Sequence, residues 1–410
     1  MWKKGSQEGD QRLIYSALWW ARWFGFYSFR SLPTKIMRVF SLVSLALTAT
    51  TTVNALPRGY QPPDKRSAVI PFLNNVLVFD APAFNDPAKP GNTLVQLQAY
   101  VSLPQLSLAP ALNGLSAMLK STLGLDIDLD RVPSRLSLFA TVPLNGKDVT
   151  VSIDGCSQSA KLQSTAQGGM AIQNVSLGAC GSGEAVAFGK VKSDSDAKFR
   201  IFPSKPDGFG VISDIDDTVK ISHSLDPLQL AKATLVDDPE PVAGMPQVFA
   251  SLAKSLNKPQ FIYVSASPFQ LYPFLRSFID DTYADSTGPI MLNNLSTTNI
   301  GDLVKTLTNP NNVFDYKSAM VDRIHGMYPK KKFLTVGDST QKDPETYGNA
   351  IRKYGDFISC AWIRKVDGAD NSDERFAAAF KGVDPSKIKI YTDAEIPGLA
   401  NIDVAGGKCN

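Results

Sequence analysis

The chain has 410 residues, of which 43% are hydrophobic and 20% charged. That is enough apolar material for two or three domains of about 150 residues each. The composition excludes a collagen-like, coiled-coil or wholly disordered chain. Lys and Arg number 42 against 39 Asp and Glu, a balance that gives no electrostatic case for a nucleic-acid partner. With two histidines and four cysteines, zinc sites and Ser–His–Asp triads lack their usual residues.

The first 55 residues have the features of a leader rather than of a folded domain. Residues 37–55 join a basic start to a short apolar run that ends at Ala55, as a signal peptide does. We therefore predict a non-native upstream extension over 1–36, cleavage near Ala55, and a secreted protein without an integral membrane segment. The alternative is a membrane anchor formed by the aromatic stretch 15–29, which basic residues interrupt or flank. Without residues 1–55 the chain has 35 basic and 37 acidic residues, so it is not basic.

Secretion would place the four cysteines in an oxidising compartment, where disulfides form. Three pairings are open. Proximity in the sequence favours Cys156–Cys180, which leaves Cys360–Cys409 to fasten the C-terminal tail. Asn174 and Asn294 each begin a glycosylation sequon, which is usable only on the secretory route.

Residues 56–204 predict a β-rich, sandwich-like accessory domain, because short apolar strands alternate with Pro, Gly and Asn. We find no catalytic constellation there. The three aspartates within 126–130 resemble the opening of a calcium loop, but Arg131 stands where the turn requires Gly, so a solvated strand or loop edge is favoured. The strands expected are 75–80, 94–101 and 135–142, with a helix near 109–123.

After a turn-rich linker at 203–208, apolar strands alternate with longer helical stretches. This pattern predicts an α/β domain over residues 205–400, a Rossmann-like parallel sheet covered by helices, followed by a tail at 401–410. Three of its strands end in a polar residue, at the edge where open α/β sheets place their sites. The strands expected are 210–213, 261–264, 333–337 and 357–363, with helices near 244–256 and 344–354.

Asp214 and Asp216 follow a buried strand two residues apart, so both carboxylates can converge on one small site. Such a pair can divide the work of phosphoryl transfer. One carboxylate attacks phosphorus, and the other protonates the leaving oxygen and then takes a proton from water. Two anions that attack a third need a counter-charge. Lys317 supplies one, and Asp338 with Asp343 could hold Mg²⁺ through oxygen ligands.

Taken singly, these residues have plainer interpretations. An isolated Asp-x-Asp is usually a solvated turn, and Ser265 could be an ordinary hydroxyl at a strand end. Lys317 could be a surface lysine, with Lys305 serving in its place, and Asp343 could cap a helix. His223 is expected to be a flanking loop residue. Their joint order and strand contexts favour catalysis over these separate explanations.

In that order and context the residues resemble the four motifs of the haloacid-dehalogenase superfamily of phosphatases. The sequence segments around these motifs are similar to the catalytic domain of the fungal actin-patch-associated phosphatidate phosphatases. The resemblance covers about residues 205–370 and does not extend over 56–200. It rests on Asp214-x-Asp216-x-Thr218, Ser265, Lys317 and Asp338 with Asp343, and on the sequence segments at 211–220, 263–273 and 336–345.

The resemblance implies a haloacid-dehalogenase-like fold, Mg²⁺, and hydrolysis of phosphatidate to diacylglycerol through a phospho-aspartyl intermediate. Asp214 would be the nucleophile, Asp216 the general acid and base, and Thr218 a support for the turn. Ser265 would bind a phosphoryl oxygen, and Lys317 would neutralise the phosphate and the attacking carboxylate. The implied metal ligands are Asp214, the backbone carbonyl of Asp216, Asp338 and Asp343.

The spacing of the motifs limits any covering cap. Asp214 and Ser265 are separated by 50 residues, and Ser265 and Lys317 by 51. The insertion at 222–242 is too short for a large cap domain. A site without a large lid cannot enclose a small metabolite by domain closure, but it can reach a phosphate displayed at a membrane surface. A phosphomonoester lipid is therefore the expected partner. The alternatives are a secreted phosphatase acting on a protein or small molecule, and a non-catalytic secreted binding or cell-wall protein.

Overall fold

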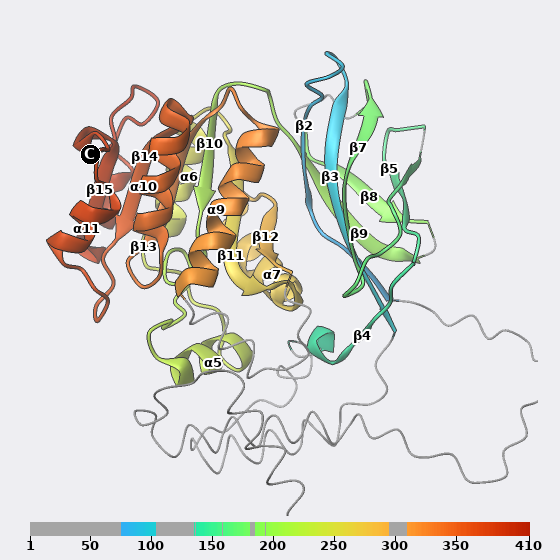
Figure 1. The fold of residues 1–410 in the computed structure, drawn as a ribbon, viewed down its shortest axis with the longest axis horizontal. Coiled ribbons are helices and arrows are strands. Elements are labelled where there is room, and N and C mark those ends of the chain that lie inside the picture. The colour runs from blue at the N-terminus through green and yellow to red at the C-terminus, as the bar shows by residue number, and fades with distance from the viewer. Residues whose placement is uncertain are drawn as a thin grey trace, which may run out of the picture.

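The computed structural model describes residues 75–103, 135, 137–157, 159–180, 185–192, 194–294 and 310–410. The predicted leader, the helix near 109–123 and the Asp-rich stretch at 126–130 lie outside these residues. Figure 1 shows two groups of elements side by side, one made of strands and one of a sheet flanked by helices. The predicted domain boundaries stay predictions.

The N-terminal group is β-rich. Nine described strands share one hydrogen-bonded network in the order β1-β3-β2-β9-β8-β5-β6, with β4 and β7 also paired to β3. Along β3 the side chains alternate between buried and half-buried over its first half, as expected of a strand with one face on a core. The strands are β1 (Asn75–Val78), β2 (Ala81–Asn85), β3 (Thr93–Leu103), β4 (Val142–Pro143), β5 (Thr150–Ile153), β6 (Ser159–Lys161), β7 (Met170–Gly178), β8 (Ala187–Val191) and β9 (Asp194–Pro203).

β6, at one end of this strand order, approaches β7, which pairs with β3. The backbone N–H of Gln163, just after β6, donates to Oε1 of Gln173 on β7 over 2.7 Å. Apolar side chains such as Leu97, Val151 and Phe199 fill the interior. The β-rich character of this part is thus observed, while its arrangement as a two-layer sandwich stays a prediction.

The strand predicted at 135–142 is wrong. Residues Ser137–Ala140 form a 3-10 helix (η1). Of the described residues in the predicted strand, Val142 alone lies in a strand, as the first residue of β4. Thr141 closes the turn, because its hydroxyl donates to the carbonyl of Leu138 over 2.8 Å and lies 2.7 Å from the hydroxyl of Tyr100. Phe139 is thereby buried. Alternating apolar and polar residues suit a strand locally, but these contacts with a distant tyrosine favour the tighter turn.

The C-terminal group is α/β, as predicted. Its six described strands are all parallel, in the order β12-β11-β10-β13-β14-β15. They are β10 (Phe209–Ser213), β11 (Gln260–Pro268), β12 (Ile290–Asn293), β13 (Lys332–Asp338), β14 (Ile358–Arg364) and β15 (Ile388–Tyr391). The helices are α5 (Pro227–Leu235), α6 (Met245–Ser255), α7 (Tyr272–Thr282), α9 (Pro310–Met327), α10 (Asp343–Tyr354), α11 (Asp373–Ala379) and α12 (Ile396–Leu399).

Helices cover both faces of the parallel sheet (Figure 1). Successive strand residues point to opposite faces, so Val211 packs with α6 and α7 in one apolar cluster and Ile212 packs with α9 and α10 in another. Because both faces are buried, the central strands are apolar throughout, which explains why they could be recognised from the sequence.

The two groups are in direct contact. The backbone N–H of Asp80 donates to the hydroxyl of Tyr272 on α7 over 2.7 Å, and the ring of Phe79 lies 4.6 Å from the ring of Tyr272. The hydroxyl of Tyr328, beyond α9, donates to the carbonyl of Ala83 over 3.2 Å. Buried aromatic and polar contacts therefore fix the β-rich part against α7 and the end of α9.

Both favoured disulfides are present, Cys156–Cys180 and Cys360–Cys409, with Cα atoms 5.7 and 5.4 Å apart. The first links the turn after β5 to the end of β7, and the second links β14 to the C-terminal tail. Among the described residues, no helix has both the length and the apolar character needed to cross a membrane.

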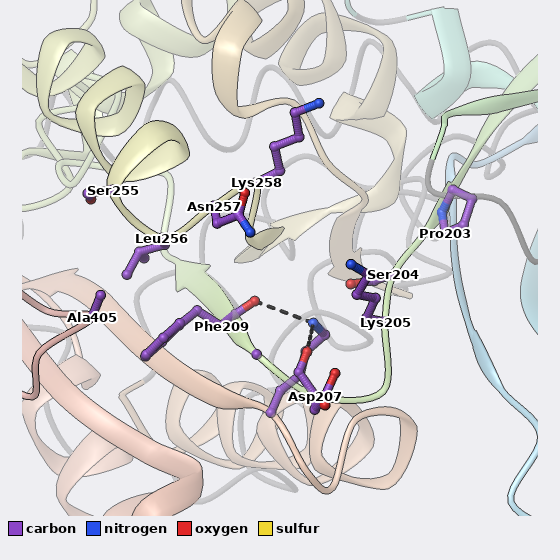
Figure 2. A pocket seen from close by; sticks show the side chains of 12 residues that line it. Pro203, Ser204, Lys205, Asp207, Phe209, Ser255, Leu256, Asn257, Lys258 and Ala405 are labelled. Carbon is purple, nitrogen blue, oxygen red and sulfur yellow. Dashed lines mark hydrogen bonds between the residues drawn. The ribbon is translucent and has the colours of Figure 1, made fainter.

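A cavity of about 440 Å³ lies where β10 and β13 begin (Figure 2), at the edge of the sheet opposite the polar strand ends. Lys331 lines it and is only 4% exposed. Its ammonium donates to the carbonyls of Asp207 and Phe209 over 2.7 and 3.4 Å. Burial lowers the pKa of Lys331 to about 8, although Asp207 opposes the shift.

Candidate active site

The chain leaves β10 through a tight turn that follows Asp214. The backbone N–H groups of Thr218, Val219 and Lys220 all point to the carbonyl of Ile215, at 3.3, 3.0 and 2.9 Å. This turn breaks the extended backbone. It therefore allows the aspartates at 214 and 216 to serve adjacent parts of one site.

Asp217 holds the turn and the loop after it. Its backbone is left-handed, with φ of 59°. Its carboxylate accepts the backbone N–H groups of Ser222, His223 and Ser224, at 2.9, 2.8 and 2.7 Å. His223 is exposed and takes part through its backbone. Asp217 is therefore a structural residue within the motif, for which the sequence pattern alone assigned no role.

Asp214, Asp338 and Asp343 come together around Lys317. The ammonium of Lys317, on α9, lies 2.7 Å from Asp214 Oδ1 and 2.5 Å from Asp343 Oδ1. The backbone N–H of Asp338, at the end of β13, donates to Asp343 Oδ2 over 3.1 Å. Lys317 thus occupies the place expected of the counter-charge, while the alternative cation Lys305 lies outside the described residues.

Gly337 allows the close approach of Asp343. A Cβ atom at position 337 would overlap the carboxylate of Asp343, the first residue of α10. The Asp343 carboxylate faces Lys317 and Asp338 rather than capping its helix, because no side-chain cap is formed at this terminus. The plainer interpretation of Asp343 as a helix cap therefore fails.

Two hydroxyls orient the remaining carboxylate oxygens. Thr218 Oγ1 lies 3.2 Å from Asp214 Oδ2 and 2.9 Å from Asp338 Oδ2, so it links the first and last motifs. Thr340 donates to Asp338 Oδ1 through its backbone N–H at 2.6 Å and through its hydroxyl at 2.5 Å. Thr340 was not singled out from the sequence, although its position two residues after an aspartate is typical of a local turn of this kind.

Burial dominates the electrostatics of this cluster. It raises the pKa of Asp214 well above the ordinary value, a shift that Lys317 opposes and the neighbouring carboxylates increase. Burial together with Asp343 raises the pKa of Asp338 to about 6. Burial would lower the pKa of Lys317, but Asp214 and Asp343 outweigh it and raise the pKa above the ordinary value. Three buried carboxylates therefore share one ammonium and lack positive charge.

This charge deficit fits a divalent cation. One oxygen of each of Asp214, Asp338 and Asp343 lies within 4.8 Å of the others, and all three residues are buried. Carboxylate oxygens are the ligands that Mg²⁺ and Ca²⁺ prefer. The geometry therefore supports a metal site formed by three of the residues expected from the sequence.

Asp216 occupies a separate, more open position beside this cluster. Its side chain is 13% exposed, against 2% for Asp214. Its Oδ2 accepts the hydroxyls of Ser265 and Ser267 at 2.8 and 2.9 Å, and its Oδ1 accepts that of Ser222 at 2.7 Å.

Burial would raise the pKa of Asp216, but Lys220 and the three hydroxyls outweigh it and hold the pKa below the ordinary value. Ser267 and Ser222 were not predicted. For Ser267 the signal was its spacing of two from Ser265, which places both on one side of β11. Ser222 had no comparable signal.

The comparisons with known proteins agree with this geometry. Residues 209–365 match the family model described as phosphatidate phosphatase APP1, catalytic domain. All the candidate site residues fall within that span.

The chain is also similar to phosphatidate phosphatase APP1 of Saccharomyces cerevisiae, with 29% identity over 180 residues. That match covers 42% of this chain and 29% of the relative, so the chain matches less than a third of that protein's length. Both comparisons relate this chain to phosphatidate phosphatases. They confirm the predicted resemblance to this catalytic domain.

Proposed function

We propose that the chain is a Mg²⁺-dependent, haloacid-dehalogenase-like phosphatidate phosphatase. The main observation that supports this proposal is the buried group of Asp214, Asp338 and Asp343 around Lys317, with Asp216 beside it. This group lies at the carboxyl ends of parallel strands, within the region that resembles the catalytic domain of phosphatidate phosphatase APP1.

Asp214 is the proposed nucleophile. Without substrate Asp216 is a carboxylate, and it takes up a proton when the negatively charged phosphate binds beside it. The Asp214 carboxylate oxygen then attacks the phosphorus atom, the bond to the leaving oxygen breaks, and Asp216 gives its proton to that oxygen. Water then attacks the phospho-aspartyl phosphorus, Asp216 takes a proton from the water, and inorganic phosphate leaves with the Asp214 carboxylate restored. The greater exposure of Asp216 supports this division of roles, because the acid must reach both the leaving group and water.

Asp214, Asp338 and Asp343 would hold Mg²⁺, which when bound would neutralise negative charge on the phosphoryl oxygens. The backbone carbonyl of Asp216 is the further ligand implied by the resemblance. Thr218 and Thr340 support this role, because their hydrogen bonds fix the carboxylate oxygens of the proposed ligands.

Lys317 and Ser265 are the proposed phosphate-binding residues. Lys317 keeps its proton, because two carboxylates within 2.7 Å stabilise the ammonium. The Ser265 hydroxyl, in the C-terminal half of β11, lies 2.8 Å from Asp216 Oδ2, and rotation about its Cβ–Oγ bond can redirect its proton towards a phosphoryl oxygen.

Phosphatidate is the proposed substrate. The printed names of the matched family and of the yeast relative support it. The elements support it too, because α5 and the loops around it are the described structure between the first motif and α6. They are too small for a domain that closes over a metabolite. We also propose secretion after cleavage near Ala55, which mass mapping of material exported by the expressing cell would test.

A phosphate-release panel tests the proposal. The protein comprising residues 56–410 would be assayed with Mg²⁺ on phosphatidate micelles, lysophosphatidate, phosphopeptides and sugar phosphates. We expect phosphatidate to be preferred, and chelation of Mg²⁺ or Asp214→Asn to abolish turnover. Asp154→Asn is the matched control, because Asp154 is exposed and lies in the β-rich part. Preference for sugar phosphates would refute the lipid substrate, and full turnover by Asp214→Asn would refute the mechanism.

A further inference from the structure

Asp216 has a neighbour that the proposed mechanism does not use. Ser222 is fully buried, and its hydroxyl donates to Asp216 Oδ1 over 2.7 Å. On its other side the hydroxyl accepts the ammonium of Lys220, again at 2.7 Å. Lys220 is only 1% exposed. A buried lysine and a buried serine therefore form a hydrogen-bond chain that ends at the proposed general acid.

The direction of these hydrogen bonds is fixed by chemistry. An ammonium group has three donors and no acceptor, whereas a hydroxyl has one proton to donate. Ser222 must therefore accept from Lys220, and its single proton is left for Asp216. The direct contact from Lys220 to Asp216 Oδ1 is longer, at 3.8 Å. Ser222 thus links Lys220 to the carboxylate through hydrogen bonds, in addition to the longer direct ion pair.

The backbone holds Ser222 in place independently of Asp216. Its N–H donates to Asp217 Oδ1 over 2.9 Å, and the N–H of Ile221 donates to the carbonyl of Glu240 over 2.8 Å. The hydroxyl of Ser222 is therefore presented from a fixed loop. Such an anchored donor can determine the orientation of the more exposed carboxylate that it contacts.

On the other oxygen, the proposed mechanism uses Ser265 for the phosphoryl group. Once that hydroxyl turns to substrate, Asp216 Oδ2 keeps the hydroxyl of Ser267, at 2.9 Å, and Oδ1 keeps that of Ser222. We propose, on the basis of the proposed function, that Ser222 held by Lys220 is a positioning residue that keeps Asp216 directed at the leaving oxygen. Ser222 touches neither the phosphate nor the metal group in this arrangement.

A positioning role has a signature that general destabilisation lacks. An alkoxide is a poor leaving group and needs a proton from Asp216, whereas p-nitrophenolate leaves readily without one. The quantity kcat/KM reports transition-state stabilisation relative to free enzyme and substrate. Misdirecting Asp216 should therefore lower kcat/KM steeply for alkyl phosphates and little for p-nitrophenyl phosphate.

The experiment compares Ser222→Ala with the wild type on aryl monophosphates of increasing leaving-group pKa and one alkyl monophosphate, with Mg²⁺. We expect p-nitrophenyl phosphate to change less than about 3-fold, and the alkyl phosphate to fall about 100-fold, the range of a lost general acid. Ser222→Thr should restore much of the loss by supplying a hydroxyl. Ser224→Ala is the matched control, because among the described residues the Ser224 hydroxyl has no hydrogen-bond partner.

An equal loss across the whole series would overturn the proposal, because it would show a merely structural role. Unchanged kinetics for Ser222→Ala would overturn it too. If Ser222→Ala fails to fold, Lys220→Met on the same series should give the same steepened dependence, and a flat response would overturn the proposal. Failure of the wild type on every member of the series and on phosphatidate would instead refute the proposed function and this inference with it.

Discussion

Lys317 Nζ lies 2.7 Å from Asp214 Oδ1, and both side chains are only 2% exposed. The two residues are on different elements, α9 and the turn after β10, and neither could be buried as a charge without a partner. The pair therefore does two things at once. It lets the proposed nucleophile stay inside the protein as a carboxylate, and it fixes α9 against the strand edge where the metal group forms.

Lys317→Met should abolish phosphate release and destabilise the protein by about 3–5 kcal/mol, the usual effect of removing one partner of a buried pair. The remaining carboxylates of Asp214 and Asp343 would be left without their shared ammonium. Urea unfolding and phosphate release measure the two effects. Lys353→Met is the control, because the Lys353–Asp322 pair is exposed, and it should change neither quantity measurably.

Gly337→Ala should weaken the metal group specifically. The added Cβ atom would meet the Asp343 carboxylate and displace it from Asp338 and Lys317. We expect about a 10-fold rise in the Mg²⁺ concentration that gives half-maximal activity, and a loss of roughly 1–3 kcal/mol in stability. Gly326→Ala is the matched control in α9, where a Cβ meets nothing within 4 Å. An unchanged Mg²⁺ requirement in Gly337→Ala would contradict the geometry.

Asp80→Asn should loosen the contact between the two groups of elements. The Asp80 side chain is 1% exposed, accepts Arg200 Nη2 on β9 at 2.6 Å, and lies 3.3 Å from Arg276 Nε on α7, so it joins the two groups. We expect a loss of roughly 3 kcal/mol in the free energy of unfolding, measured in urea. Asp148→Asn, which breaks the exposed pair with Lys161, should have no measurable effect. Equal effects of the two substitutions would refute the structural importance of Asp80.

Lys331→Gln should change how stability depends on pH. The folded-state pKa of Lys331 is lowered to about 8 from an ordinary 10.5. Between these values the unfolded chain binds a proton that the folded chain does not, so the wild type gains stability as pH rises from about 8 to 10.5. The gain is at most about 3 kcal/mol. Gln keeps a donor for the carbonyl of Asp207 but does not titrate, so the variant should lack this gain. Parallel curves of unfolding free energy against pH for the two proteins would contradict the prediction.

Much of the candidate site could be predicted, because its signals are local. Asp214 and Asp338 stand at the ends of apolar strands that are buried on both faces, and Ser265 lies in the C-terminal half of a third such strand. The topology of a parallel sheet brings these positions to one edge. Thr218 lies four residues after Asp214, so the single turn between them brings their side chains within hydrogen-bond distance. The favoured cysteine pairs followed from proximity and from what remained.

What the sequence by itself determined is therefore the parallel sheet and the residues at its strand ends, because strand burial and turn residues are encoded within a few neighbouring positions. Only the tertiary structure decided which side chains complete the site. Ser222 reaches Asp216 because the Asp217 carboxylate accepts three backbone N–H groups of the loop that follows. The contact between Tyr100 and Thr141, 41 residues apart, favours the 3-10 helix η1 where a strand was predicted. Such contacts depend on the three-dimensional path of the chain, which no local pattern of apolar and polar residues records.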